Sequence, residues 1–433
     1  MVIIIGGGIT GLSLAYLLSH KGFPVTVVEK ETELGGNCSW AKLGNFTVDR
    51  YYHVITNTDS AFLNWAVNLG IGDKIFPIKT KMGFYQEGKI FSISTPADFL
   101  KFPPLSFLQC MRLGVSIIRS RMVKDWHSLE GVTAKHWLSS LAGEDIYKKL
   151  WDPVIRNKFG PLTDELVATD MWFRINRISS MQHKKFKDNA YYLKGSLKTF
   201  FDALEKYLLD KGVKIIKGCA VSSLKANGSC ISAVVLNNRQ EISADKIISA
   251  IPLPEFARIL PSGYEDYSQR LRKVRYLNNV SLILRLKHKF SPYYQLNIGE
   301  DGFPFTGIIG ADAQYPPRDF QGSFLLYVSK YFTGEDNILN KNAGELLDDY
   351  MPYLKKIRPE FETSWVLDKT VTRGRNVETI HSLNYSQLIP SFTTPIPNLY
   401  LLCTAQIYPE ATVLDESFKY AGRLVNRFFD TNE

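Results

Sequence analysis

Three glycines near the N-terminus have the spacing of a phosphate-binding turn. Gly6, Gly8 and Gly11 follow the apolar run from Val2 to Ile5, which is typical of a buried parallel strand. Gly6 permits a tight turn, Gly8 lets the backbone approach a pyrophosphate, and Gly11 allows a helix to pack closely on the strand. The start of that helix offers free N–H groups and a positive dipole end to an anion. The pattern predicts a dinucleotide-binding turn.

The following residues supply a ribose contact. A helix predicted from Leu12 to His20 leads to a second apolar strand, Val25 to Val28, and that strand ends in Glu29, eighteen positions after Gly11. Glu29 would accept hydrogen bonds from ribose hydroxyls, and its charge would repel a 2′-phosphate and so disfavour NADP. Strand, glycines, helix, strand and acid occur in the required order. The predicted binding set also includes Ile9, Thr10 and Lys30.

A second glycine pair decides between FAD and NAD. The segment from Leu34 to Ser39 contains Gly35-Gly36-Asn37 a few residues after Glu29. It resembles the glycine doublet that flavoproteins place after the ribose-binding acid, where the backbone passes close to the FAD pyrophosphate. NAD dehydrogenases do not usually have this doublet. The sequence therefore predicts FAD, with Gly35, Gly36 and Asn37 among its contacts.

With these motifs the chain resembles the FAD superfamily of amine oxidases, protoporphyrinogen oxidases and UDP-galactopyranose mutases. The doublet and the stretch from His53 to Asp59 are similar to the mutase branch. Three mid-chain features are similar to segments of both branches; they are Trp151-Asp152-Pro153, Lys158-Phe159-Gly160 and the Arg174/Arg177 pair. Later segments resemble bacterial and archaeal protoporphyrinogen-oxidase-like proteins; they are Phe303 to Gly307, Leu325-Leu326-Tyr327 and Ala405 to Glu410. The resemblance covers most of the chain.

The resemblance implies an α/β protein with an α+β second lobe. A Rossmann-type FAD-binding domain, formed by residues 1–80, 190–252 and 396–433, would be interleaved with a substrate-binding domain of mixed sheet and helices, formed by 81–189 and 253–395. Val221, Thr404, Ala405 and Tyr408 would complete the FAD contacts. Where many relatives have Gly-Asp, this chain has Cys403-Thr404-Ala405, so backbone N–H groups and Thr404 are expected to replace the carboxylate.

In this superfamily the flavin carries the reaction, and three residues are candidates for work beside it. His53 follows two tyrosines and would lie near the flavin ring, or alternatively pack against backbone. Arg174, with Arg177, would bind an anionic substrate group by its guanidinium fork, or form structural salt bridges. Tyr327 would wall the pocket, or pack in the core. Covalent flavin attachment at Cys403 is disfavoured, since a buried neutral thiol is commoner. The seven scattered histidines predict no metal site.

Composition limits the class and the partners. With 433 residues, 45% hydrophobic, and no apolar run of about 18 residues or more, the chain reads as globular, without a membrane span. Five cysteines without a pattern suit a reducing compartment, and no signal peptide is recognisable, so a cytoplasmic location is predicted. The net charge of +9 permits several anionic partners, but no nucleic-acid-binding pattern occurs.

Two basic regions bear on partners. Residues 96–124 combine apolar residues with Arg112, Arg119, Arg121 and Lys124, which fits either an interfacial helix at a membrane or a helix packed on the core. Residues 269–289 are interpreted as a half-buried strand, with Val280, Leu282, Leu284 and Leu286 on one face and a solvated basic face opposite.

Three functions remain open on the sequence. The first is an FAD-dependent oxidoreductase acting on an organic small molecule, with phosphorylated, glycosylated and lipid-like substrates all allowed. The second is a redox-neutral sugar-nucleotide mutase, in which the arginines hold a diphosphate. The third is a non-catalytic prenyl- or lipid-binding protein of the same architecture, against which the intact glycine and Glu29 set argues.

Overall fold

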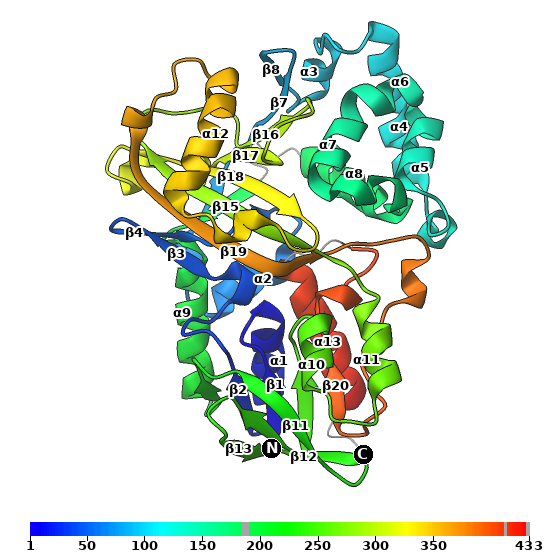
Figure 1. The fold of residues 1–433 in the computed structure, drawn as a ribbon, viewed down its shortest axis with the longest axis vertical. Coiled ribbons are helices and arrows are strands. Elements are labelled where there is room, and N and C mark those ends of the chain that lie inside the picture. Colours follow the sequence, from blue (N-terminus) through cyan, green and yellow to red (C-terminus); the bar gives the residue numbers. More distant parts are fainter. Residues whose placement is uncertain (184–189, 411–413, 430–433) are drawn as a thin grey trace.

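A computed structural model describes residues 1–183, 190–410 and 414–429. Residues 184–189 of the predicted segment 81–189, and residues 411–413 and 430–433 of the predicted segment 396–433, lie outside this description. The chain is elongated in two halves: one half contains both termini, and the other contains a sheet beside a group of helices (Figure 1). None of the described helices has the length and apolarity that crossing a bilayer requires.

The half with the termini is built on a five-stranded, fully parallel sheet. Its strands come from three distant stretches of the chain; in spatial order they are β10 (Lys214–Ile216), β2 (Val25–Val28), β1 (Val2–Ile5), β14 (Lys246–Ser249) and β20 (Leu399–Leu401). β1 and β2 are buried along their full length, as their unbroken apolar runs predict.

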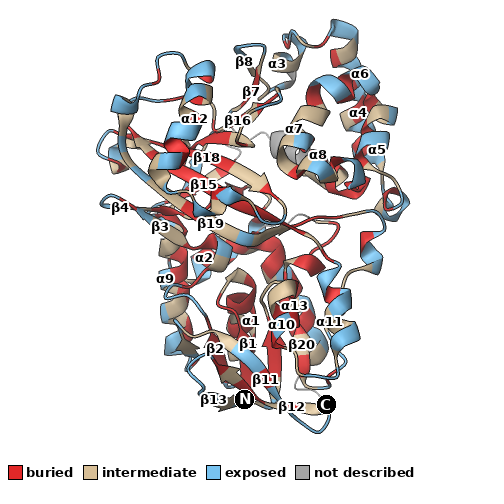
Figure 2. Cartoon of the chain, viewed as in Figure 1, coloured by how far each residue is buried: buried red, intermediate tan, exposed pale blue. Residues whose placement is uncertain are grey.

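Helices cover both faces of this sheet. One face packs against α1 (Ile9–His20), α2 (Ser60–Asn68), α9 (Ser196–Asp210) and α13 (Leu414–Phe428). The other face packs against α10 (Leu253–Ile259), α11 (Glu265–Arg272) and an antiparallel sheet of β11 (Val221–Asn227), β12 (Cys230–Leu236) and β13 (Glu241–Ser243). Figure 2 shows buried residues concentrated on the central strands and exposed residues on the outer faces of the helices. Helix α1 starts at Ile9, three residues earlier than predicted.

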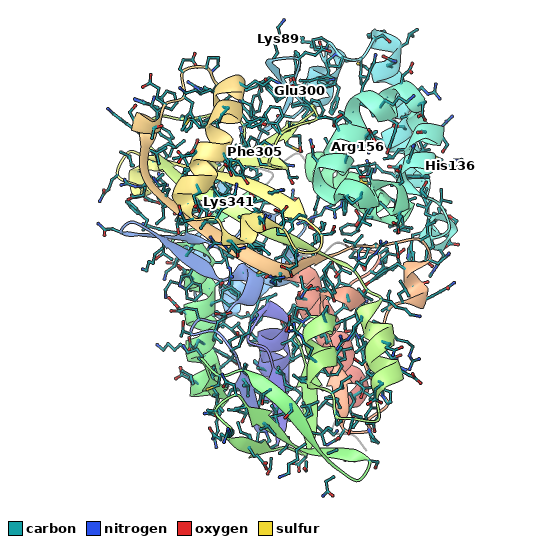
Figure 3. The ribbon with its side chains drawn as sticks, viewed as in Figure 1. Lys89, His136, Arg156, Glu300, Phe305 and Lys341 are labelled. Carbon is teal, nitrogen blue, oxygen red and sulfur yellow. The ribbon has the colours of Figure 1, made fainter. Side chains whose placement is uncertain are left out.

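The second half contains a seven-stranded mixed sheet and a group of helices. In spatial order the strands are β19 (Val366–Thr379), β15 (Tyr276–Leu286), β18 (Phe324–Phe332), β17 (Gly307–Gly310), β16 (Gln295–Ile298), β7 (Met82–Gln86) and β8 (Lys89–Ser92). Helix α12 (Ala343–Ile357) covers one face of this sheet. Phe305, labelled in Figure 3, lies in that interface, with its ring centroid 5.1 Å from that of Tyr350 on α12.

The helices beside this sheet come from the middle of the chain. They are α3 (Pro96–Leu100), α4 (Phe107–Met122), α5 (Ala134–Ala142), α6 (Glu144–Ile146), α7 (Asp152–Phe159) and α8 (Ala168–His183). Two small sheets, β3 (Trp40–Leu43) with β4 (Phe46–Asp49), and β5 (Ile55–Thr56) with β9 (Ala190–Leu193) and β6 (Ile75–Ile78), complete the described strands.

The interpretation of residues 269–289 as a half-buried strand was wrong. β15 lies between β18 and β19 and is buried at every position except Arg285. Leu282 and its same-face neighbours pack beneath α12, but Ile283 on the opposite face also lies in a buried cluster. Arg285 is ion-paired with Asp368 at 2.5 Å. Alternating polarity could not reveal the second covering layer, because the residues that form it are distant in sequence.

Candidate functional site

The glycine turn after β1 has the geometry that a bound pyrophosphate needs. Gly6 has a φ of +108°, and its N–H donates to the Val28 carbonyl at 2.8 Å. A Cβ on Gly11 would lie 1.9 Å from the Gly6 carbonyl oxygen, so only glycine allows α1 to start this close to the strand. No described side chain caps the helix, whose first turn contains Ile9 and Thr10 and no acid. Its first N–H groups can therefore bind an anion.

The predicted glycine doublet lies directly against this turn. The Gly35 N–H donates to the Gly7 carbonyl at 2.8 Å, and a Cβ on Gly36 would lie 3.2 Å from the Gly8 Cα. A Cβ on Gly8 would lie 3.9 Å from the Gly36 Cα, so the two backbones pass close to each other with no side chain between them. A dinucleotide diphosphate fits this requirement for two bare backbone segments.

Glu29 is placed beside the same turn. Its carboxylate is buried and accepts the N–H groups of Gly7 at 2.6 Å and Glu31 at 2.9 Å. Burial raises the pKa of Glu29, while these two hydrogen bonds oppose the rise. The Glu29 carbonyl accepts the Cys219 N–H at 3.1 Å, which brings Val221, two residues further on, towards this edge. Lys30 is exposed, with its Nζ 3.9 Å from a Glu31 carboxylate oxygen.

The last predicted cofactor segment follows β20. The Leu402 N–H donates to the Ser249 carbonyl of β14 at 2.9 Å, which sets Thr404 and Ala405 at the carboxyl edge of the parallel sheet. Thr404 is partly exposed, and the Ala405 carbonyl accepts the Tyr385 hydroxyl at 2.8 Å. Burial raises the pKa of the Cys403 thiol to about 12, so this cysteine stays protonated.

Tyr408 points towards the helical part of the second half. Its hydroxyl lies 2.7 Å from the Thr169 hydroxyl of α8, and its ring packs edge-on against His381 with centroids 5.0 Å apart. Tyr408 therefore connects the end of the cofactor segment to α8. Residues 411–413, which follow in sequence, are outside the described residues.

His53 lies next to the glycine-doublet segment. Its Nε2 is 3.7 Å from the Cys38 Sγ, and its Nδ1 is 3.0 Å from the Tyr51 carbonyl. The carbonyl can only accept, so the Nδ1 carries the proton. Burial lowers the pKa of His53, and the bond to Tyr51 opposes this shift. The ring is therefore neutral at neutral pH, and its unprotonated Nε2 faces the Cys38 thiol as an acceptor.

Asp49 is a buried acid that the sequence interpretation missed. Its carboxylate accepts the Leu197 N–H of α9 at 2.8 Å, and burial raises its pKa to about 6. With His53, Gln314 and Tyr315 it lines a small cavity. The available signal was the position of this acid, four residues before His53.

Tyr327 is hydrogen-bonded to the backbone of Asp49 and lies in the core. It is fully buried, and its hydroxyl donates to the Asp49 carbonyl at 2.8 Å. Its neighbours belong to the core cluster of β15, β17 and β18. These contacts correspond to the core-packing alternative for Tyr327.

Arg174 lies in a partly buried ionic cluster, defined here as Lys158, Asp170, Arg174, Glu378 and His381. The Arg174 guanidinium contacts Asp170 at 2.6 Å and Glu378 at 2.7 Å. Lys158 contacts Glu378 at 2.8 Å, and the His381 ring lies 3.3 Å from Asp170. Arg177 does not join this cluster but pairs with Asp59 at 3.3 Å. The structure thus places both arginines in salt bridges with carboxylates.

The ionic cluster fixes the charges of its members. Burial disfavours the charge of Asp170, but Arg174 and His381 outweigh it and hold the Asp170 pKa well below its usual range. Burial also opposes ionisation of Glu378, and Lys158 with Arg174 lowers its pKa nonetheless. Burial, with the nearby Arg174 charge, lowers the pKa of Lys158.

Two tyrosines connect the ionic cluster to the His53 segment. The Tyr52 and Tyr331 hydroxyls are 3.3 Å apart, and the Lys158 Nζ lies 5.1 Å from the centre of the Tyr331 ring. Since Tyr52 precedes His53 in the sequence, these contacts link the His53 segment to the ionic cluster.

A glycine cradle, formed by the turn from Gly6 to Gly11 and the Gly35-Gly36 doublet at the edge of a parallel sheet, is typical of a dinucleotide-binding α/β protein. The family model described as flavin containing amine oxidoreductase matches residues 9–408. The chain therefore belongs to that family. The predicted superfamily, the α/β fold class and the FAD cofactor are thereby confirmed.

Curated relatives are distant. The chain is 24% identical over 288 residues to a 4,4'-diapolycopen-4-al dehydrogenase of Metabacillus indicus, covering 60% of this chain and 57% of that protein. It is 23% identical over 411 residues to the coproporphyrinogen III oxidase of Bacillus subtilis, covering 82% of each. For the dehydrogenase and a 4,4'-diapolycopene oxygenase of a Methylomonas species, the match spans 57% and 60% of the relative's length.

Solved structures share the fold over nearly the whole chain. A putative protoporphyrinogen oxidase from Exiguobacterium has a TM-score of 0.77 at 15% identity and covers 98% of both chains. A reduced UDP-galactopyranose mutase has a TM-score of 0.74 at 16% identity, over 98% of this chain and 94% of that one. At such identities the likeness describes the fold.

Proposed function

We propose that this protein is an FAD-dependent oxidoreductase that oxidises a lipophilic small molecule. The observation that carries the proposal is the glycine cradle, where the uncapped start of α1 and the bare backbones of Gly8 and Gly36 lie beside the buried Glu29. The first-turn N–H groups of α1 would hold the phosphates, Glu29 would hold a ribose, and Thr404 with Ala405 would contact the remainder of the cofactor. When bound, the flavin supplies hydride acceptance at its N5 position.

The residues beside the cradle would orient the substrate and control protons. Neutral His53, with its Nε2 free of a backbone partner, can accept a proton or hydrogen bond from a substrate group. The nearby Asp49, whose pKa is about 6, can exchange a proton near neutral pH. Tyr52 and Tyr331 would form an apolar wall with hydroxyl groups at its edge. The ionic cluster would hold α7, α8 and β19 around this space. It would take no part in electron transfer.

The substrate class rests on two observations. The relatives are named for diapolycopenal, diapolycopene, diaponeurosporene, phytoene and coproporphyrinogen, which supports a lipophilic organic substrate. The two predicted anion-binding arginines are already paired with Asp170, Glu378 and Asp59. A sugar-nucleotide diphosphate would have to displace these carboxylates, so the salt bridges argue against the mutase alternative.

The experiment begins with the visible spectrum of the purified protein. A bound flavin gives a yellow protein that is bleached by anaerobic reduction. A protein that is colourless and takes up no added FAD would contradict both this proposal and the mutase alternative, leaving the non-catalytic one. Turnover is then tested with a carotenoid in detergent and an artificial electron acceptor. Conversion of UDP-galactopyranose by the reduced protein, without net electron flow, would instead establish the mutase.

Glu29→Arg tests the ribose contact within the same experiment. The substitution removes the acceptor and places a cation beside Gly7, so flavin retention is expected to fall at least tenfold, since hydrogen bonds to charged groups contribute about 1.5–3 kcal/mol. Glu31→Arg is the matched control, because Glu31 contacts Glu29 through its backbone N–H alone. Equal flavin content in Glu29→Arg and the wild type would show that Glu29 does not bind the ribose.

A further inference from the structure

Helix α4 has an apolar stripe that no described part of the chain covers. The stripe consists of Phe107, Leu108, Met111, Val115, Ile118 and Met122, whose exposed fractions range from 45% to 78%. Leu100 on the preceding helix α3 is 50% exposed as well. Large apolar side chains exposed together in this way usually mark an interaction surface.

The stripe is distinct from the face by which α4 packs on the protein. Cys110, Leu113, Ser116 and Ser120 are buried against neighbouring helices, and the Ser120 carbonyl accepts the Trp172 indole N–H of α8 at 3.0 Å. With about 100° of rotation per residue, the stripe and the buried face lie on opposite sides of the helix. The stripe is therefore not needed to hold α4 in place.

Cations flank the stripe on both sides. By the same rotation, Arg112 and Arg119 lie along one edge of the stripe and Arg121 along the other. Lys101 directly follows α3, and Lys124 lies two residues after the end of α4. Within the described chain, none of these five cations forms an ion pair. No Asp or Glu occurs between Asp98 and Asp125. An apolar stripe between two cationic edges matches a surface with apolar material below a layer of anionic groups.

We propose that the α4 stripe docks the protein on an anionic lipid bilayer. The apolar side chains would enter the acyl boundary, and the flanking cations would contact lipid phosphates, with the helix in the plane of the interface. Charge decides against a second copy of the chain as the occupant. Two α4 helices packed on each other would bring their arginines together without any acid to pair them.

The proposal is tested by flotation of the holoprotein with lipid vesicles. We expect binding to phosphatidylcholine vesicles that contain phosphatidylglycerol, and much weaker binding to pure phosphatidylcholine. The double variant Leu108→Ser/Ile118→Ser should bind at least about tenfold less, because two apolar side chains no longer enter the lipid. The matched control is Val67→Ser/Leu209→Ser, which changes two equally exposed apolar residues on α2 and α9 and should bind as the wild type does.

A second variant separates the charge contribution. Arg119→Gln/Arg121→Gln should lower the partition to anionic vesicles by about fivefold for each cation removed, and high salt should remove the same difference. Because all substituted residues are exposed, flavin content and melting temperature should stay at wild-type values and show that the variants are folded.

Three results would overturn the proposal. One is equal vesicle binding by Leu108→Ser/Ile118→Ser and the wild type. Another is equal binding to neutral and anionic vesicles. The third is a wild-type dimer in light scattering that Leu108→Ser/Ile118→Ser converts to a monomer, because this would assign the stripe to a second copy. Failure of the flavin test under the proposed function leaves this inference unaffected, since it does not depend on the cofactor.

Discussion

At the scale of single residues, Asp49 and His53 have pKa values that burial shifts in opposite directions. Burial raises the pKa of Asp49 to about 6 and lowers that of His53. In both cases the low-polarity surroundings favour the neutral form. A buried acid and a neutral imidazole beside the glycine cradle are the groups best suited to exchange protons there, and both lie within four residues of one another in the chain.

Asp49→Asn tests this burial through the pH dependence of stability. Because the folded-state pKa is raised, the carboxyl contributes most to the free energy of unfolding below pH 4, and this contribution is lost as the pH rises through 6. The shift corresponds to about 3 kcal/mol. The free energy of unfolding of the wild type minus that of Asp49→Asn, measured by urea unfolding across this range, should fall by up to that amount as the pH rises. A constant difference would contradict the prediction. Asp202→Asn, on the exposed side of α9, is the control.

Gly11→Ala tests the close approach of α1 to β1. The new Cβ would lie 1.9 Å from the Gly6 carbonyl oxygen, so the helix must shift, at a cost of about 3 kcal/mol or more, and flavin should be lost. Gly422→Ala is the matched control in α13, where the new Cβ meets no atom within 4 Å. It should stabilise the protein by about 0.5–1 kcal/mol. Urea unfolding and flavin absorbance measure both effects, and a fully stable Gly11→Ala would refute this account of the turn.

At the scale of elements, the ionic cluster connects two helices to a strand. Lys158 belongs to α7, Arg174 to α8 and Glu378 to β19, and Glu378 contacts both cations. The cluster thus holds the helical part of the second half against its sheet. In a partly buried network of this kind, the loss of one partner leaves the others without compensation.

Glu378→Gln should therefore destabilise the protein by about 1.5–3 kcal/mol, which is the usual contribution of hydrogen bonds to charged groups. A further fall in the pKa of Lys158 is expected because its nearest anion is gone. Glu241→Gln removes one partner of an exposed pair with Lys225 and should have a much smaller effect. Urea unfolding at neutral pH compares the two variants. If both variants lose the same small amount of unfolding free energy, the cluster does not hold α7 and α8 on β19.

At the scale of the whole molecule, one sheet collects strands from three distant stretches of the chain. Residues 2–28, 214–249 and 399–401 all contribute, so the cofactor cradle can form only when these three stretches have come together. Binding of FAD to the folded form should stabilise the whole protein, by about 2.7 kcal/mol at a hundredfold excess over Kd.

A thermal melt with and without added FAD measures this coupling. The protein freed of flavin should melt at a lower temperature, and added FAD should restore the wild-type value. Glu29→Arg should show no such rise, since it lacks the ribose acceptor. If FAD binds to the wild type, measured by its absorbance, without raising the melting temperature, the predicted coupling is wrong.

The sequence by itself determined the cofactor turn. The cofactor turn depends on backbone conformations and close approaches that few residues other than glycine allow. The spacing of its glycines therefore predicts the turn without tertiary information; they are Gly6, Gly8, Gly11, Gly35 and Gly36. The same holds for β1 and β2, whose unbroken apolar runs predict burial on both faces. The family resemblance added the family and the α/β fold class, which the comparisons confirm.

Only the tertiary structure decided which groups meet. Arg174 and Glu378 are 204 positions apart, and no local pattern could show that this arginine is already paired. The alternating pattern predicted a half-buried β15, because a local pattern does not show that distant residues cover the second face of this strand. In α4 the sequence gives two apolar faces, but packing determines which face is buried and which remains exposed. Local geometry follows from residue type, whereas burial and pairing depend on neighbours that only the folded chain brings together.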